Sequence, residues 1–146
     1  MNLIKINRDV LLKPLQAVSG IIERRHTLPI LSNVLLVRTP NRIDFVATDI
    51  EIEITASAAT DGQGEPRNIT IGARKFLDIL RALPEGSEVS LAMQEKRLQI
   101  NSGKSRFNLQ TLPAEDFPRL SEADAPPTKF TVPQKLLKNL INLVQY

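Results

Sequence analysis

Short segments in which apolar and polar residues alternate recur along the chain, and each is followed by apolar residues at helical spacing. The segment at 4–6 returns at 69–71, and a third copy stands at 130–132. Strict alternation favours a half-buried strand, and apolar residues three or four apart favour an amphipathic helix. Each copy therefore predicts a strand that leads into a helix. Because the third copy reaches Tyr146 without further strands, we expect the chain to be part of a longer protein.

The similarity between the first two copies continues through three more alternating segments. At one constant offset, 34–36 matches 89–91, 42–45 matches 97–100, and 51–54 matches 106–109. Alternation of this kind is typical of antiparallel strands with one buried face. The pattern predicts two βαβββ units that form one α+β domain, with antiparallel sheets outside and two helices on one side. This offset is shorter than the one between the opening strands, which places ten extra residues of the first unit within 19–32.

The stretch 112–128 separates the predicted domain from the third copy. It is rich in proline and acidic residues, so it cannot continue a helix or a central strand and should form a stiff linker. We expect a first domain at 1–120, a linker at 121–128 and the truncated start of a second domain at 129–146. The apolar face of the last predicted helix needs a sheet that this chain does not contain.

Composition narrows the possible function classes. None of the 146 residues is cysteine, which excludes disulfides and thiolate metal sites and is compatible with a reducing compartment. No apolar run is long enough for a membrane span and no signal-peptide layout is present, so we expect a cytoplasmic protein without a membrane partner. The net charge is only +3, yet residues 44–65 contain acids and no base, whereas residues 96–106 contain bases and no acid.

The predicted helices carry basic residues on the faces opposite their apolar stripes. In the first helix, Lys13 faces away from Leu11 and Leu15. In the second helix, Arg74 and Arg81 share the face opposite the apolar stripe. Any one of these bases is typical of a solvated helix surface. Their recurrence in equivalent helices favours contacts with the phosphates of a nucleic acid.

Three carboxylates at alternate positions come closest to catalytic chemistry. On one face of a strand, Asp49, Glu51 and Glu53 could bind a hard divalent cation, and a metal-dependent hydrolase is the enzyme alternative. Isoleucines occupy the intervening positions, which favours a plain solvent-exposed strand face. His26, the one histidine, has no carboxylate placed to orient it in a catalytic triad. We expect no catalytic residue, no metal site and no cofactor.

Several short motifs, in order and across nearly the whole chain, resemble one family. They are 27–31 with Asn33, 47–49 with Glu51, 73–76, 83–86, 102–107 and 111–118. Together they closely resemble the N-terminal domain of the bacterial DNA polymerase III beta subunit, the sliding-clamp family. The resemblance implies three similar domains per subunit and a ring of two subunits around duplex DNA, with basic helices lining the hole. It also implies a non-catalytic processivity factor that does not read sequence.

The resemblance further implies roles for individual residues. Arg25 corresponds to an arginine on a loop that reaches duplex DNA, and Lys13, Arg74 and Arg81 correspond to positions on the pore-facing helices. The strand at 104–110 corresponds to the edge that pairs with the partner subunit. Its implied contacts are the apolar Phe107 and Leu109, and the bases Lys75, Lys104 and Arg106, which would face acids of the partner.

The implied partners are duplex DNA, a second clamp subunit, and a DNA polymerase and clamp loader that bind later domains. A free-standing nucleic-acid-binding module is the alternative interpretation. It would explain the basic helix faces, but it would not explain the third copy of the repeat.

Overall fold

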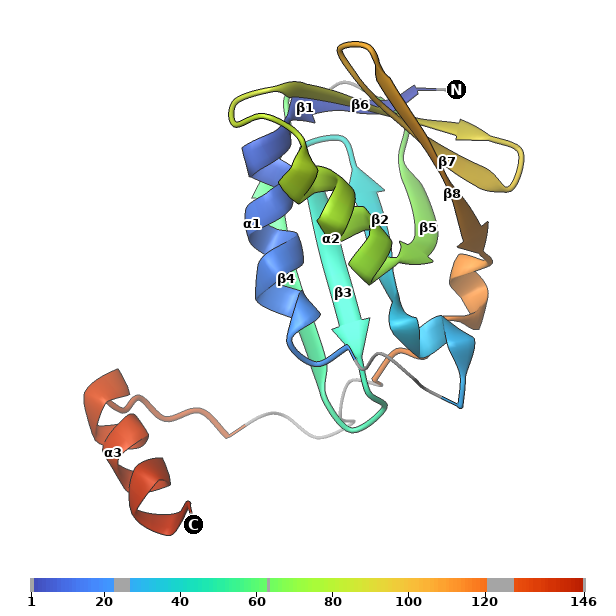
Figure 1. Cartoon of the computed structure of the whole chain (residues 1–146). Coiled ribbons are helices and arrows are strands. Elements are labelled where there is room, and N and C mark those ends of the chain that lie inside the picture. The colour runs from blue at the N-terminus through green and yellow to red at the C-terminus, as the bar shows by residue number, and fades with distance from the viewer. Residues whose placement is uncertain (1, 23–26, 63, 121–127, 146) are drawn as a thin grey trace.

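The computed structural model describes residues 2–22, 27–62, 64–120 and 128–145 (Figure 1). The first unit contains β1 (Asn2–Asn7), α1 (Arg8–Ser19), the 3-10 turn η1 (Pro29–Ser32), β2 (Asn33–Thr39), β3 (Arg42–Thr48) and β4 (Glu53–Ala59). The second contains β5 (Arg67–Gly72), α2 (Ala73–Ala82), β6 (Glu88–Gln94), β7 (Arg97–Ser102) and β8 (Ser105–Leu112), and is followed by η2 (Ala114–Asp116) and α3 (Gln134–Val144). One sequence offset relates β1 to β5 and α1 to α2, and a shorter one relates β2 to β6 and β3 to β7. The predicted duplication is confirmed.

The eight strands form one antiparallel sheet in the order β1-β6-β7-β8-β5-β2-β3-β4. Each unit lends its first strand to the other unit, because β1 pairs with β6 and β5 pairs with β2. The two four-stranded halves meet only where Thr70 and Ile71 pair with Leu112 and Thr111. The sheet curls behind the helices, so that α1 and α2 lie together on one face (Figure 1).

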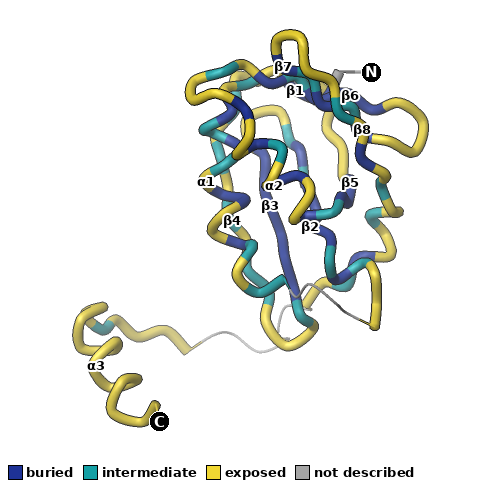
Figure 2. Tube along the Cα trace, viewed as in Figure 1, coloured by how far each residue is buried: buried dark blue, intermediate teal, exposed yellow. Residues whose placement is uncertain are grey.

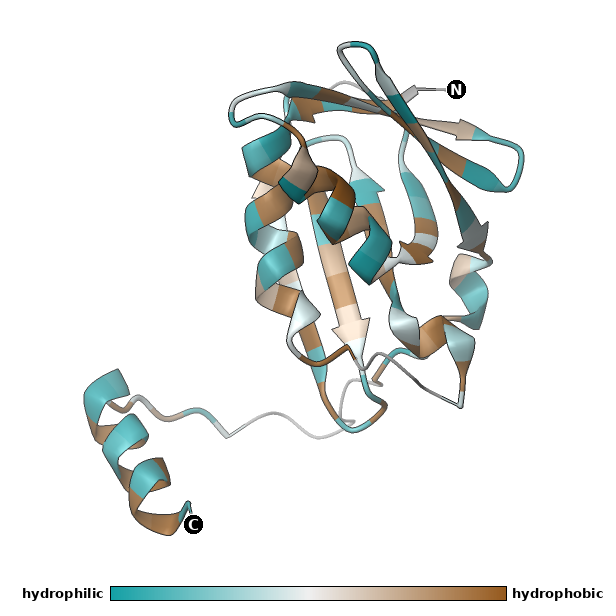
Figure 3. Ribbon diagram, viewed as in Figure 1, coloured by the Kyte–Doolittle hydropathy of each residue, from teal (hydrophilic) through white to brown (hydrophobic). Residues whose placement is uncertain are grey.

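The main hydrophobic core lies between the two helices and the sheet. Leu11 and Leu15 of α1 and Phe76 and Leu80 of α2 are fully buried there, as the predicted stripes required. Figure 2 shows the buried positions running along the facing sides of the helices and the central strands, and Figure 3 shows that these positions are hydrophobic. Burial of each such side chain contributes about 2 kcal/mol to the free energy of folding.

The start of α1 and the end of α2 are joined by one polar network. Asn7 caps α1 by accepting the N–H of Asp9 (2.8 Å), and its amide donates to the carbonyl of Gly86 (3.1 Å). The buried Arg8 donates through Nε to the carbonyl of Leu80 in the last turn of α2 (2.7 Å). Hydrogen bonds from Arg8 and from the Gly86 N–H lower the pKa of Asp9. Arg8 thereby fixes the ends of both helices to each other.

The segment 113–120, here called the strap, packs on the sheet face opposite the helices. Phe117 is 4% exposed and forms a second small cluster with Leu35 and Val46. Arg119 donates to both carboxylate oxygens of Glu53, each at 3.0 Å. The linker-like composition from residue 112 onward is therefore misleading for the strap, because one buried aromatic side chain and one ion pair hold it on the sheet, within the first domain expected at 1–120. Residues 121–127 lie outside the described ranges.

Replacing Glu53 with glutamine is expected to lower the free energy of unfolding by about 1 kcal/mol at neutral pH. Burial raises the pKa of Glu53, but hydrogen bonds from Arg119 and from the Leu120 N–H outweigh burial, so the pKa lies below its ordinary value. The stabilisation is therefore complete above the ordinary glutamate pKa and is lost as the pH falls through the lowered one. Urea unfolding at several pH values should show the wild-type advantage shrinking in acid. Glu51→Gln, an exposed neighbour, is the control; an equal effect there would contradict the assignment.

The third copy of the repeat is only partly formed. Its helix, α3, is present as predicted, but 130–132 is not a strand, and Phe130 is largely exposed. The equivalent strands β1 and β5 both pair with the second strand of another unit, and the described residues contain no third set of such strands. The apolar residues of α3 are exposed and join neither hydrophobic cluster. None of the helices within the described ranges is long and apolar enough to cross a membrane.

Candidate nucleic-acid interface

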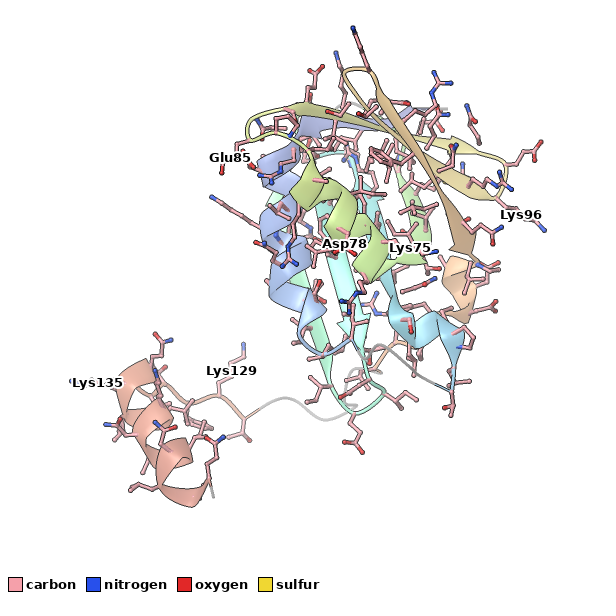
Figure 4. All side chains as sticks on the ribbon, viewed as in Figure 1. Lys75, Asp78, Glu85, Lys96, Lys129 and Lys135 are labelled. Atoms are coloured by element: carbon pink, nitrogen blue, oxygen red, sulfur yellow. The ribbon has the colours of Figure 1, made fainter. Side chains whose placement is uncertain are left out.

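The outward faces of α1 and α2 form one surface on the side away from the sheet. Lys13 of α1 and Arg74 and Arg81 of α2 are all exposed, as their helical spacing predicts. Figure 4 shows Asp78 projecting from α2 on this side. In the part of the chain that is described, none of the three bases forms a salt bridge. Arg25, the fourth predicted DNA contact, lies outside the described residues.

A hollow of about 310 Å³ opens on this surface beside the end of α1. Its lining consists of Ser19, Ile22, Ser32, Ala73, Arg74, Leu77, Asp78 and Arg81. The two arginines and the Ser32 hydroxyl can donate hydrogen bonds to an anion, whereas the Ser19 hydroxyl already donates to the carbonyl of Leu15. Asp78 between the arginines reduces the positive potential. Sequence reasoning did not find the two serines, because they stand at the ends of the inserted segment, where no periodicity fixes their direction.

The three carboxylates of the hydrolase alternative do not share a strand face. Residues 49–52 form a turn in which Asp49 accepts the backbone N–H groups of Glu51 (3.0 Å) and Ile52 (2.7 Å), and β4 begins only at Glu53. Ile50 has a positive φ of 82° and is 49% exposed, so the predicted alternation is wrong here. Glu53 is engaged by the strap. Within the described ranges no three potential ligands gather as a metal site requires, so these residues do not support a hydrolase.

The predicted interface strand, β8, has an open edge over most of its length. It pairs with β7 from Ser105 to Gln110, but only Leu112 and Thr111 pair with β5 on the other side. Lys104 and Arg106 are exposed at its start. An unpaired edge offers backbone N–H and C=O groups to a further strand.

The two apolar residues predicted for this interface lie in different surroundings. Leu109 is only 8% exposed and belongs to the main core, whereas Phe107 is half-buried and packs against that core. A groove of about 520 Å³ runs along the open edge and reaches Lys75 and Arg74 in the first turn of α2. The structure thus brings Lys75 beside Leu109 along this groove, while Lys104 and Arg106 stand at the other end of the strand.

Sequence comparison places this arrangement among known proteins. The model of the DNA polymerase III beta subunit, N-terminal domain, matches residues 1–121. The beta sliding clamp of Proteus mirabilis is 48% identical over 141 residues, which are 97% of this chain and 38% of that protein. The beta sliding clamp of Escherichia coli K12 is 45% identical with the same coverage.

Solved structures agree in fold as well as in sequence. The DNA polymerase III subunit beta of Pseudomonas aeruginosa matches with a TM-score of 0.90 at 42% identity, over 97% of this chain and 38% of that one. The pol III beta of Caulobacter crescentus matches with a TM-score of 0.89 at 42% identity and the same coverage. This chain therefore spans well under half the length of these relatives. Since the family model covers most of its residues, the chain belongs to the DNA polymerase III beta subunit family and corresponds to the N-terminal domain.

Proposed function

We propose that this chain is the first domain of a sliding clamp, the processivity factor of a bacterial replicative DNA polymerase. Two copies of the whole subunit would close a ring around duplex DNA. The observation that carries the proposal is the helix layer, on which Lys13, Arg74 and Arg81 all turn away from the sheet. The names of the relatives, beta sliding clamps, support the same function.

Such a domain needs no bond chemistry. A ring holds its polymerase on DNA topologically, so its contacts with phosphates must be numerous enough to centre the duplex and weak enough to let it slide. Long basic side chains on rigid helices fit this role because they neutralise phosphates without reading bases. The carboxylate of Asp78 between Arg74 and Arg81 keeps each contact weak. Arg25 would add a contact from the inserted loop.

The open edge of β8 would pair with the partner subunit in the ring. Phe107 would supply apolar contact, and Lys75, Lys104 and Arg106 would meet acidic residues of the partner, while the buried Leu109 would support the strand from within. The DNA polymerase and the clamp loader would bind later domains of the subunit. We place the protein in the cytoplasm, without a cofactor.

The chain alone is expected to bind duplex DNA weakly, with affinity that falls steeply as salt rises. Binding should be weak because one domain offers few phosphate contacts. Changing both Arg74 and Arg81 to alanine should reduce the slope of log affinity against log salt by about 1 to 2. This corresponds to roughly 0.9 for each phosphate that is no longer neutralised. Fluorescence anisotropy of a labelled duplex over a range of low salt concentrations measures both quantities.

Lys96→Ala is the matched control for this experiment. Lys96 is also an exposed base, but it lies on the β6–β7 turn, away from both helices (Figure 4). It should leave the slope unchanged. Tight binding of the chain at physiological salt, or equal effects of the control and the helix variants, would exclude the proposed DNA face.

A further inference from the structure

The hollow beside the end of α1 is lined by charged side chains that do not pair with one another. Asp78 stands four residues after Arg74 and three residues before Arg81, a spacing at which opposite charges on a helix often pair. Among the described residues, however, none of the three forms an ion pair or a side-chain hydrogen bond, and neither does the Ser32 hydroxyl. Two cations, one anion and one hydroxyl group are therefore free to bind a ligand.

The hollow also has an apolar floor. Ala73 is 1% exposed and Leu77 is 7% exposed, and the half-buried Ile22 lines the hollow with them. The volume of about 310 Å³ lies at the lower end of the range for small-ligand sites, about 300 to 1,000 Å³. Helix α2 is held to α1 by Arg8, so the floor and the charged groups have a rigid support. A flat, partly apolar ring fits this floor better than a bare ion does.

The carboxylate of Asp78 argues against a plain phosphate site. Between two arginines it repels a free phosphate, yet it is the acceptor that a nucleobase with N–H groups requires. Arg74 and Arg81 lie seven residues apart, about 10 Å along the helix axis, a span that one nucleotide can bridge. The start of β2 pairs with the end of β5, which places Ser32 beside Arg74 at the first turn of α2. Arginine binds phosphate bidentately and also stacks on flat rings, so both ends of a nucleotide find a partner.

The same carboxylate distinguishes among the bases. Guanine carries a ring N–H and an amino group side by side on its pairing edge, and both can donate to the two oxygens of one carboxylate. Adenine and cytosine have one amino group there, next to a ring nitrogen that repels a carboxylate. Thymine and uracil have one N–H between two carbonyl oxygens, which repel it more. In a duplex the opposite base occupies all these groups, so only an unpaired guanine is recognised.

We propose that the hollow is a nucleotide site that prefers guanine, supplied by a free nucleotide or by the unpaired end of a DNA strand. Asp78 accepts the two N–H groups of the base, and the base lies on Leu77. Arg74 and the Ser32 hydroxyl bind the phosphate, while Arg81 stacks on the ring. The inference goes beyond the proposed function, because contact with the phosphates of a duplex needs no base recognition. Binding is weak, because the hollow is open to solvent.

NMR titration of the isotope-labelled full chain tests the site. The probes are GMP, AMP, CMP, UMP and inorganic phosphate, each added at low salt. We expect GMP to shift the amide signals of residues 73–81 and to bind about tenfold more tightly than UMP or phosphate, with AMP and CMP between them. A duplex with an unpaired terminal guanine is then compared with one that ends in thymine. Tighter binding of the guanine-ended duplex assigns the strand end as the source, and equal binding of the two assigns the free nucleotide.

Asp78→Asn separates base recognition from a structural role. The variant should bind GMP about tenfold more weakly. It should at the same time bind duplex DNA more tightly, since a negative charge near the phosphates is lost. Glu85→Gln, which is also exposed and lies just beyond the end of α2, removes the same charge and should leave GMP binding unaltered (Figure 4).

Two results would overturn the nucleotide site: equal binding of all the probes, or GMP binding that is unaltered in Asp78→Asn. The first would show that the hollow attracts any anion. The salt slope that depends on Arg74 and Arg81 tests the proposed function separately. If that slope is retained while the nucleotides fail to discriminate, only the inference about guanine fails.

Discussion

Replacing Arg8 with alanine is expected to destabilise the domain by about 2 to 3 kcal/mol. Arg8 is 8% exposed, and its Nε donates to the carbonyl of Leu80 at 2.7 Å, with a longer contact of 3.5 Å from Nη2 to the carbonyl of Arg81. Carbonyls in the last turn of a helix lack partners within the helix and carry its negative dipole end. In the alanine variant, the carbonyl groups of Leu80 and Arg81 lose the guanidinium that binds them at a largely buried position.

Urea unfolding followed by circular dichroism measures this effect. Arg8→Lys should recover only part of the loss, because an ammonium group cannot reproduce the fork of guanidinium donors. Lys5→Ala is the matched control: Lys5 pairs with Glu88 at 2.7 Å, but both side chains are mostly exposed, so the change should cost less than about 0.5 kcal/mol. If the Arg8 and Lys5 variants were equally stable, Arg8 could not be the residue that links the two helices.

The order of elements could be predicted because each depends on local periodicity. The two helices and eight strands of the duplicated units follow from spacing alone, apart from the start of β4, and the matched offsets identify equivalent elements. The exchange of β1 and β5 between the halves of the sheet could not be predicted, because it is decided by pairing between residues far apart in sequence. Local alternation carries no information about which strand will be the neighbour.

The errors arose where a local side-chain contact outweighed the pattern. Alternation through residues 49–52 resembled a strand, but Asp49 accepts two backbone N–H groups and stabilises a turn instead. The strap resembled a linker in composition, and only the burial of Phe117 with the ion pair from Arg119 shows otherwise. A single anchoring residue such as Phe117 belongs to no repeating pattern, so the sequence gives no sign that it is buried.

For the candidate site, the sequence could predict which helix face the basic side chains occupy. It could not predict how far the interface residues are buried. Helical spacing correctly placed Lys13, Arg74 and Arg81 on exposed faces. For Phe107 and Leu109, alternation gives the face they share, but how far each is covered depends on the end of the core. Leu109 proves buried and Phe107 only half-buried, a difference that decides how the interface must be tested.

Reversing both charges at the start of β8, by changing Lys104 and Arg106 to glutamate, is expected to abolish the proposed ring dimer of the complete subunit. Both side chains are exposed, so the fold should survive. If acids of the partner face them, each reversal replaces attraction by repulsion across the interface. Leu109→Ala is the wrong test, because removal of a core side chain costs about 2 to 4 kcal/mol by itself and would confuse unfolding with dissociation.

Sedimentation of the complete subunit distinguishes the outcomes. The double reversal should sediment as a folded monomer at concentrations where the wild type is a dimer, and raised salt should weaken the wild-type dimer as well. The same reversals at Lys96 and Arg97, which lie on the β6–β7 hairpin and are equally exposed, change the net charge by the same amount and should leave the dimer intact. A folded β8 variant that still dimerises as tightly as the wild type would show that this edge is not where the subunits meet.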